Sequence, residues 1–236
     1  MAYTSALPTP AVDPALHRFG EGATAVVTLD NIWGDVNAVI DTAASLLPFP
    51  PARNHYPGVR RMITPNDRIA DAYVTQLLER AAPFIGGAYD VDRFDLVEAS
   101  FSMVTTRPDR LSKVQCAPHF DTMEDQYFAV MHYLRATAGT AFYRHQKTGI
   151  ERVTEANLAT FVAHAARESR HVPPNYITSS NDVFEQIGVV EGLVDRLVIY
   201  PGSLLHSGVI MPDAPLSADP YEGRLTTNMF IRAKCT

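Results

Sequence analysis

Cysteine is nearly absent from this sequence, since only Cys116 and Cys235 occur among its 236 residues. Two widely separated cysteines exclude a disulfide framework and a four-cysteine zinc site. A chain of this length buries enough surface to fold without such cross-links. We therefore expect an ordinary hydrophobic core to hold the chain together.

Long apolar runs and clusters of basic residues are also missing. No stretch approaches the roughly 20 apolar residues of a membrane-spanning helix, and the first residues lack the basic and apolar regions of a signal peptide. The formal net charge is −6, with 20 basic and 26 acidic residues, which makes nucleic acid and anionic membranes unsuitable partners. We expect a soluble, cytoplasmic protein and leave its oligomeric state open.

Proline, in contrast, is abundant, and 17 prolines divide the chain. Prolines between residues 48 and 57 separate two segments with apolar residues at helical spacing, 33–47 and 69–81. The second segment follows Pro65-Asn66-Asp67, which is a helix start signal. We expect both helices to pack an apolar face against a sheet, so the first half is interpreted as helical.

The second half changes to short strands rich in β-branched and aromatic residues. The predicted strands are 97–105, 127–133, 140–143, 196–200, 205–210 and 225–231. A turn at Ala138-Gly139 precedes the third strand, and a helix is predicted over 154–167 with Thr154 as its N-cap. This order favours an α+β fold, a double-stranded β-helix (jelly roll) with N-terminal supporting helices. We expect one domain over residues 1–236, with a helical flank at about 30–90 and a jelly-roll core at about 97–232.

The candidate chemistry begins with the tripeptide His119-Phe120-Asp121. Residues two apart on an extended strand share one face, so the imidazole and the carboxylate can lie side by side. Together they supply two of the three ligands of a facial metal site. A single His-x-Asp arises readily by chance, and a surface pair without metal is its ordinary interpretation.

Two later segments favour the metal site. A strand, a Pro201-Gly202 turn and a return strand bring His206 to a strand entrance. The last strand opens with Arg224 and Thr226, which share one face. A guanidinium that faces a sheet interior is costly unless an anion is bound, and its planar fork matches a carboxylate.

Over about residues 97–232, the chain resembles the iron(II)- and 2-oxoglutarate-dependent oxygenases, in particular the prolyl-hydroxylase-like branch. The resemblance rests on an ordered set of side chains: His119, Asp121, His206, Arg224 and Thr226. The strand that ends at Tyr133-Leu134 is also similar, because a tyrosine just before leucine contacts the cosubstrate in that branch. The stretch Tyr56-Pro-Gly-Val-Arg60 resembles one in small bacterial proteins of unassigned function, and this likeness names no substrate.

The resemblance implies an Fe(II) site with three ligands: His119, Asp121 and His206. It implies a 2-oxoglutarate site in which Arg224 pairs with the far carboxylate and the hydroxyls of Thr226 and Tyr133 help. Together with O₂, these cofactors imply hydroxylation of an unactivated C–H bond in an unidentified substrate, either a small amino-acid-like molecule or a peptide. Because related halogenases lack the carboxylate ligand, Asp121 favours hydroxylation or desaturation over halogenation.

Two alternatives stay open. The first is a cupin-type metal oxygenase, a class that usually carries His-x-His and a following glutamate; no His-x-His occurs here. The second is a non-catalytic jelly-roll binding module.

His132 alternates with Tyr133, so we expect it to face away from the candidate site, into a helix-covered layer.

Overall fold

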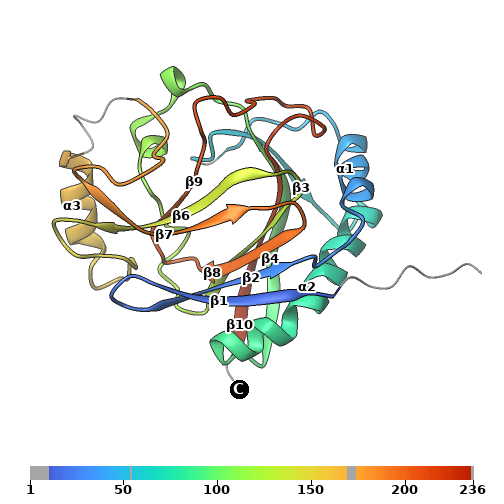
Figure 1. The fold of residues 1–236 in the computed structure, drawn as a ribbon, viewed down its shortest axis with the longest axis horizontal. Coiled ribbons are helices and arrows are strands. Elements are labelled where there is room, and N and C mark those ends of the chain that lie inside the picture. The colour runs from blue at the N-terminus through green and yellow to red at the C-terminus, as the bar shows by residue number, and fades with distance from the viewer. Residues whose placement is uncertain (1–10, 54, 169–173, 235–236) are drawn as a thin grey trace, which may run out of the picture.

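The computed structural model describes residues 11–53, 55–168 and 174–234, so Cys235 lies outside the described residues. The chain forms two antiparallel sheets (Figure 1). The large sheet has the strand order β1-β2-β8-β5-β10-β4-β3, and the small sheet has the order β7-β6-β9. Strands from both halves of the chain therefore join one large sheet.

The elements have the following bounds. The large sheet contains β1 (Asp13–Phe19), β2 (Thr24–Asp30), β3 (Gly58–Ile63), β4 (Arg93–Val104), β5 (Tyr127–Tyr133), β8 (Arg196–Pro201) and β10 (Leu225–Lys234). The small sheet contains β6 (Thr137–His145), β7 (Phe184–Gly192) and β9 (His206–Gly208). The helices are α1 (Val36–Ser45), α2 (Arg68–Tyr89) and α3 (Leu158–Glu168), and two 3₁₀ turns are η1 (Pro108–Arg110) and η2 (Lys113–Cys116).

Helices α1 and α2 lie together at one side of the molecule, and α3 lies at the other (Figure 1). Leu77 and Ile85 of α2 pack in one buried cluster with Phe101 of β4 and Met229 of β10. Burial of this apolar stripe stabilises the helix against the sheet. The prediction that the N-terminal helices pack on a sheet is confirmed. No helix in the described parts of the chain is long and apolar enough to cross a membrane.

The opposite face of the large sheet looks toward the small sheet. Tyr133, Val198 and Tyr200 form a buried cluster there with Phe142 and Val190 of the small sheet. His132 points the other way, where its ring bonds to the hydroxyl of Tyr73 on α2, as the alternation predicts. The space between the sheets is therefore the interior in which a site can form.

The helical interpretation of the first half is wrong in part, because β1, β2 and β3 lie there. Strand β2 is almost wholly buried, and a short continuous apolar run cannot be assigned by periodicity alone. Strand β1 at the edge of the large sheet is largely exposed and has no alternating pattern. Strand β7 was also not predicted, so the strands omitted are those with the weakest local pattern.

Several predicted boundaries need correction. Strand 127–133 is confirmed. Helix α3 spans Leu158–Glu168 rather than 154–167, and a turn over 155–157 precedes it, in which the Asn157 side chain accepts from the Thr154 N–H. Gly139 does not form a turn: it lies inside β6 with φ +96°, at an irregularity in the register with β7. A Cβ at this position would come within 1.8 Å of the Val190 carbonyl, so the close approach of two strands requires glycine.

Candidate active site

The three side chains of the predicted metal triad lie together at one end of the interior. One ligand atom from each of His119, Asp121 and His206 lies within 4.8 Å of the others. His119 is not in a named strand; it forms an isolated antiparallel bridge with His206, through backbone bonds of 2.9 and 2.8 Å. The Asp121 N–H donates to the Gly202 carbonyl at 2.7 Å. The Pro-Gly turn thus holds the His-x-Asp segment beside β9.

The side-chain spacing suits a single small ion. Asp121 Oδ1 lies 3.9 Å from His119 Nε2, and its Oδ2 lies 3.6 Å from His206 Nε2. Nδ1 of His206 lies 2.8 Å from the Leu204 carbonyl oxygen, so this nitrogen carries the proton and donates. The lone pair is then on Nε2, which faces the other two side chains, as in metal-ligating histidines.

The protein environment disfavours charge on every member of the triad. Burial lowers the pKa of His206 to about 4. Burial and then the neighbouring His206 ring lower the pKa of His119 to about 4, although half of its side chain is open to the cavity, where water offsets part of the effect. Burial raises the pKa of Asp121 to about 6, against the opposing effect of His119. A divalent cation suits this environment, because it binds neutral imidazoles and stabilises the ionised form of the carboxylate.

A cavity of about 400 Å³ opens over the triad. This volume lies in the range of small-molecule sites. Its wall is mainly aromatic and apolar, with the following polar side chains: His55, Tyr56, Arg60, Glu98, Gln115, Tyr127, Tyr176, Tyr200, Ser207, Arg224 and Asn228. Arg224 is thus in the same cavity as the triad.

Arg224 is a buried cation without an acidic partner among the described residues. The residue is 6% exposed, one terminal nitrogen donates to the Gly139 carbonyl at 3.3 Å, and Nε has no hydrogen-bond partner. Its guanidinium carbon lies 5.9 Å from the centre of the Tyr133 ring. A buried guanidinium without a counter-ion is unfavourable, so this site fits the carboxylate of a bound acid.

Thr226 and Tyr133 face each other as register partners on β10 and β5, and both are fully buried. The Tyr133 hydroxyl lies 2.6 Å from the hydroxyl of Thr140. Neither Thr226 nor Tyr133 belongs to the cavity lining that the described residues form. Their contact with a cosubstrate stays a prediction.

Among the polar side chains of this cavity that were not predicted as site residues, three lie on neighbouring strands of the large sheet. Arg60 comes from β3, Glu98 from β4 and Asn228 from β10. Asn228 lies in the predicted strand 225–231, where it shares a face with Thr226, so alternation already indicated its direction. Arg60 lies in β3, which was not predicted as a strand. For Arg60, the sequence offered only the resemblance of the Tyr56–Arg60 stretch to one in small bacterial proteins, and that resemblance assigned no role to Arg60.

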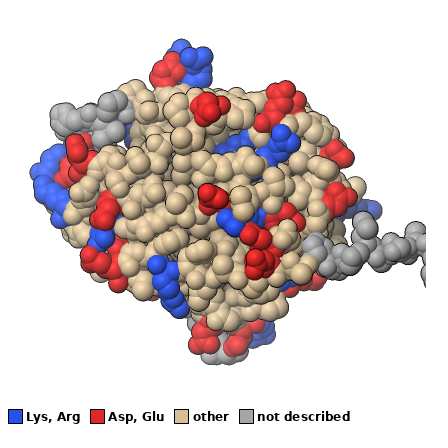
Figure 2. Space-filling model, in the orientation of Figure 1, with Lys and Arg blue, Asp and Glu red and all other residues tan. Residues whose placement is uncertain are grey.

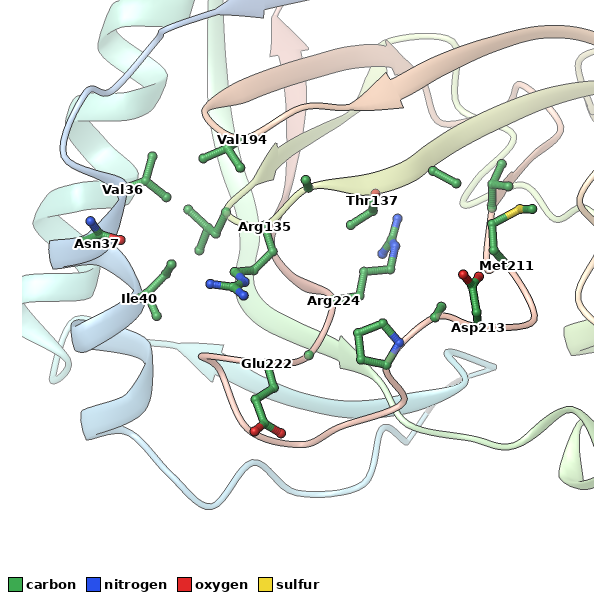
Figure 3. A pocket seen from close by; sticks show the side chains of 17 residues that line it. Val36, Asn37, Ile40, Arg135, Thr137, Val194, Met211, Asp213, Glu222 and Arg224 are labelled. Carbon is green, nitrogen blue, oxygen red and sulfur yellow. The ribbon is translucent and has the colours of Figure 1, made fainter.

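A second cavity of about 570 Å³ reaches Arg224 from another side (Figure 3). Its walls come from α1, the β5–β6 connection and the loop before β10, and its charged side chains are Arg135, Asp213, Glu222 and Arg224. In Figure 3 the guanidinium groups of Arg135 and Arg224 point away from each other. They therefore do not form a second paired anion site.

Comparison with known proteins identifies a family and a fold. The model of a family described as a family of unknown function (DUF6445) matches residues 10–231. None of the curated proteins matches the sequence. HygX from Streptomyces hygroscopicus with iron bound has a similar structure, with 11% identity, 89% of this chain and 83% of HygX covered, and a TM-score of 0.54.

A second similar structure is SnoN, the non-heme α-ketoglutarate-dependent epimerase of nogalamycin biosynthesis. It is 9% identical over 89% of this chain and 78% of SnoN, with a TM-score of 0.52. HygX with nickel and 2-oxoglutarate bound is 14% identical over 89% of this chain and 83% of HygX, with a TM-score of 0.52. At these identities the likeness shows a shared fold, and the predicted resemblance to 2-oxoglutarate-dependent enzymes is confirmed at that level.

Proposed function

Because this chain belongs to DUF6445, a family of unknown function, we propose its activity from its site: it is an Fe(II)- and 2-oxoglutarate-dependent dioxygenase. It hydroxylates an unactivated C–H bond of a small molecule. One observation carries this proposal, namely that one cavity is lined by a two-histidine, one-carboxylate cluster and by a buried arginine with no acidic partner among the described residues. That combination matches a facial iron site with an anchor for an acid.

In this proposal, Nε2 of His119, Nε2 of His206 and a carboxylate oxygen of Asp121 hold Fe(II). The Leu204 carbonyl keeps the His206 ring in the tautomer and orientation that ligation needs. When bound, Fe(II), 2-oxoglutarate and O₂ supply the oxidation: one oxygen atom enters succinate, CO₂ leaves, and the other oxygen enters the product hydroxyl. The protein orients the substrate and limits water around the site.

Arg224 pairs with the far carboxylate of 2-oxoglutarate, and the hydroxyls of Thr226 and Tyr133 assist. The Thr140 hydroxyl holds the Tyr133 side chain in place. This assignment is supported by the absence of an acidic partner for Arg224 in the described residues and by relatives in fold, since HygX has been solved with nickel and 2-oxoglutarate. SnoN has been solved with Fe³⁺ and α-ketoglutarate.

We assign the two facing sheets to a double-stranded β-helix and the chain to a single oxygenase-like domain. A small-molecule substrate is supported by the limited cavity volume and by HygX, which has been solved with hygromycin B. On the face in Figure 2, acidic and basic groups are interspersed and form no extended basic patch, in keeping with a partner other than nucleic acid.

Metal-dependent conversion of 2-oxoglutarate tests the proposal. The wild-type protein, reconstituted with Fe(II), is expected to bind one metal ion per chain and to release succinate from 2-oxoglutarate in the presence of O₂. His119→Ala and Asp121→Ala are each expected to lose both properties, because each removes a ligand. Wild-type succinate release by either variant would contradict the assignment.

The same assay separates the alternatives. Metal binding without consumption of 2-oxoglutarate would favour a cupin-type enzyme, and a failure to bind metal would favour a binding module. SnoN has a similar fold and is an epimerase, so the molecular mass of the product is also measured by mass spectrometry. A gain of one oxygen atom is expected for hydroxylation, whereas an unchanged mass would indicate an isomerisation.

A further inference from the structure

Arg60 and Glu98 form a second charged pair in the cavity that holds the triad. Arg60 Nη1 lies 3.6 Å from Glu98 Oε1, and the side chains are 11% and 38% exposed. A charge-assisted hydrogen bond between such groups is usually about 2.7–2.9 Å long. The pair is therefore close but loosely joined, and neither residue is among the three candidate metal ligands.

Arg60 is held in position by neutral groups. Its Nε donates to the hydroxyl of Ser102 at 3.2 Å, and its guanidinium carbon lies 5.4 Å from the centre of the Tyr56 ring. These contacts orient the guanidinium without neutralising its charge. The Nη1 edge that faces Glu98 remains available for a carboxylate.

Asn228 adds an acceptor to the same wall. Its Oδ1 is buried and has no hydrogen-bond partner, and the residue lines the cavity from β10. A buried acceptor that lacks a donor is unfavourable. The cavity therefore offers a fixed positive group, a carboxylate and an unsatisfied acceptor, which together match a ligand that has both a carboxylate and an N–H donor.

We propose that Arg60 and Glu98 bind the α-carboxylate and the α-ammonium group of a free amino acid, which is the substrate. This inference rests on the proposed oxygenase function. The ammonium nitrogen and the carboxylate carbon of an α-amino acid are attached to one carbon atom. The two groups can therefore lie edge-on along two side chains whose charged atoms are 3.6 Å apart, each facing the partner of opposite charge. Each charge of the zwitterion gains a partner of opposite sign, and no net charge is buried.

The rest of the cavity suits the side chain of such a ligand. Apolar and aromatic residues line it, including Val104, Met131, Ile210 and Phe230. A volume of about 400 Å³ that also holds the cosubstrate leaves room for one small molecule. An internal residue of a peptide has neither free charge and would leave both Arg60 and Glu98 without the partners that the zwitterion supplies.

Binding to the intact protein tests this inference. The twenty amino acids are titrated by calorimetry into protein loaded with Ni(II) and 2-oxoglutarate, and in parallel are added to the Fe(II) protein in the succinate assay. At least one amino acid is expected to bind and to increase succinate release. Its N-acetyl and methyl-ester derivatives are each expected to bind about 10- to 100-fold more weakly, because each loses one charge-assisted contact.

Substitutions identify the side chains responsible. Glu98→Gln is expected to lower the affinity for the amino acid and to remove the discrimination against its N-acetyl form. Arg60→Met is expected to remove the discrimination against the methyl ester. Arg60→Lys keeps the charge without the fork and is expected to retain part of the affinity. The control is Arg61→Met on the same strand, because Arg61 pairs with Asp67 at 2.7 Å outside the cavity lining; this variant is expected to bind like the wild type.

The outcomes distinguish the two proposals. If the Fe(II) protein releases succinate from 2-oxoglutarate but no amino acid binds, the amino-acid inference is overturned and the oxygenase function stands. Equal affinity of an amino acid for the wild type and Arg60→Met overturns it as well. If the protein neither binds metal nor releases succinate, the oxygenase function itself fails.

Discussion

At the scale of single residues, several side chains of the candidate site are held in place by hydrogen bonds to other parts of the protein. His206 uses Nδ1 on the Leu204 carbonyl, and Tyr133 uses its hydroxyl on Thr140. Arg224 differs, because its Nε has no hydrogen-bond partner, while one terminal nitrogen donates to the Gly139 carbonyl. A hydrogen bond to the protein orients a side chain. A buried polar group without such a bond indicates where a ligand binds.

Arg224→Ala is expected to weaken 2-oxoglutarate binding by about 10- to 100-fold, because it removes a charge-assisted pair. Metal affinity should be unchanged, since Arg224 is not among the three grouped ligands. Calorimetric titration of Ni(II) and then of 2-oxoglutarate separates the two effects. Arg135→Ala, in the second cavity, serves as the control. An unchanged 2-oxoglutarate affinity in Arg224→Ala would mean that another cation binds the acid.

His132 makes the stability of the metal-free protein depend on pH. Its ring lies between the Tyr73 hydroxyl at 2.7 Å and Asp195 Oδ1 at 3.0 Å, and burial lowers the pKa of His132 from its ordinary 6.5, although Asp195 opposes the shift. The folded state therefore resists protonation. Its contribution to stability is fully present above pH 6.5 and is lost as the pH falls below 6.5, because the unfolded chain then binds the proton.

Urea unfolding of the metal-free wild type and of His132→Gln at pH 7.5 and 5.5 measures this contribution. The wild type is expected to lose more stability between the two pH values, by up to about 1.4 kcal/mol per pH unit for one proton. The contributions of the other histidines cancel in the difference between the proteins. Parallel losses in both would show that His132 is not the group that titrates.

At the scale of elements, β6 connects the small sheet to the cosubstrate anchor. Gly139 lies in this strand with φ +96° and approaches the Val190 carbonyl of β7 closely, while its own carbonyl accepts from Arg224. A local irregularity of the β6–β7 register therefore positions the guanidinium. Such irregularities are common beside functional sites because they redirect one backbone group without disturbing the rest of the sheet.

Gly139→Ala is expected to lower the free energy of unfolding and also to weaken 2-oxoglutarate binding, because the new Cβ displaces β6 from β7. Gly87→Ala in α2 is the matched control, since a Cβ there meets no atom within 4 Å. The control should be more stable by about 0.5–1 kcal/mol, as alanine favours a helix over glycine. Urea unfolding and calorimetry measure both variants. If Gly139→Ala behaves like Gly87→Ala, the strand contact does not constrain this position.

At the scale of the whole molecule, the site connects the two sheets. His206 belongs to the small sheet, Arg224 lies immediately before β10 of the large sheet, and His119 forms a bridge to His206 from a loop. Helices α1 and α2 cover the far face of the large sheet. A ligand bound between the sheets therefore stabilises contacts between segments that are distant in sequence.

Addition of Ni(II) and 2-oxoglutarate is expected to raise the thermal unfolding temperature of the wild type. A ligand at 100 times its Kd stabilises the native state by about 2.7 kcal/mol. Asp121→Ala should show little of this increase, because it lacks one metal ligand. Scanning calorimetry with and without a chelator measures the shift. An equal increase in the variant would indicate metal binding elsewhere on the protein.

The sequence by itself determined the residues with strong local patterns. It predicted strand β5, the apolar stripe of α2, and the order of His119, Asp121, His206 and Arg224, because each depends on spacing along one segment. It also predicted the direction of His132, since alternation is a local property of a strand. The resemblance to 2-oxoglutarate-dependent enzymes followed from that order.

Only the tertiary structure decided which distant residues share a cavity. Strand β3 has a weak local pattern and becomes a strand by pairing with β4, and this pairing brings Arg60 beside Glu98. Likewise, the absence of an acidic partner for Arg224 in the described residues depends on every segment packed around it. Pairing and burial are properties of non-local contacts, so periodicity along one segment contains no information about them.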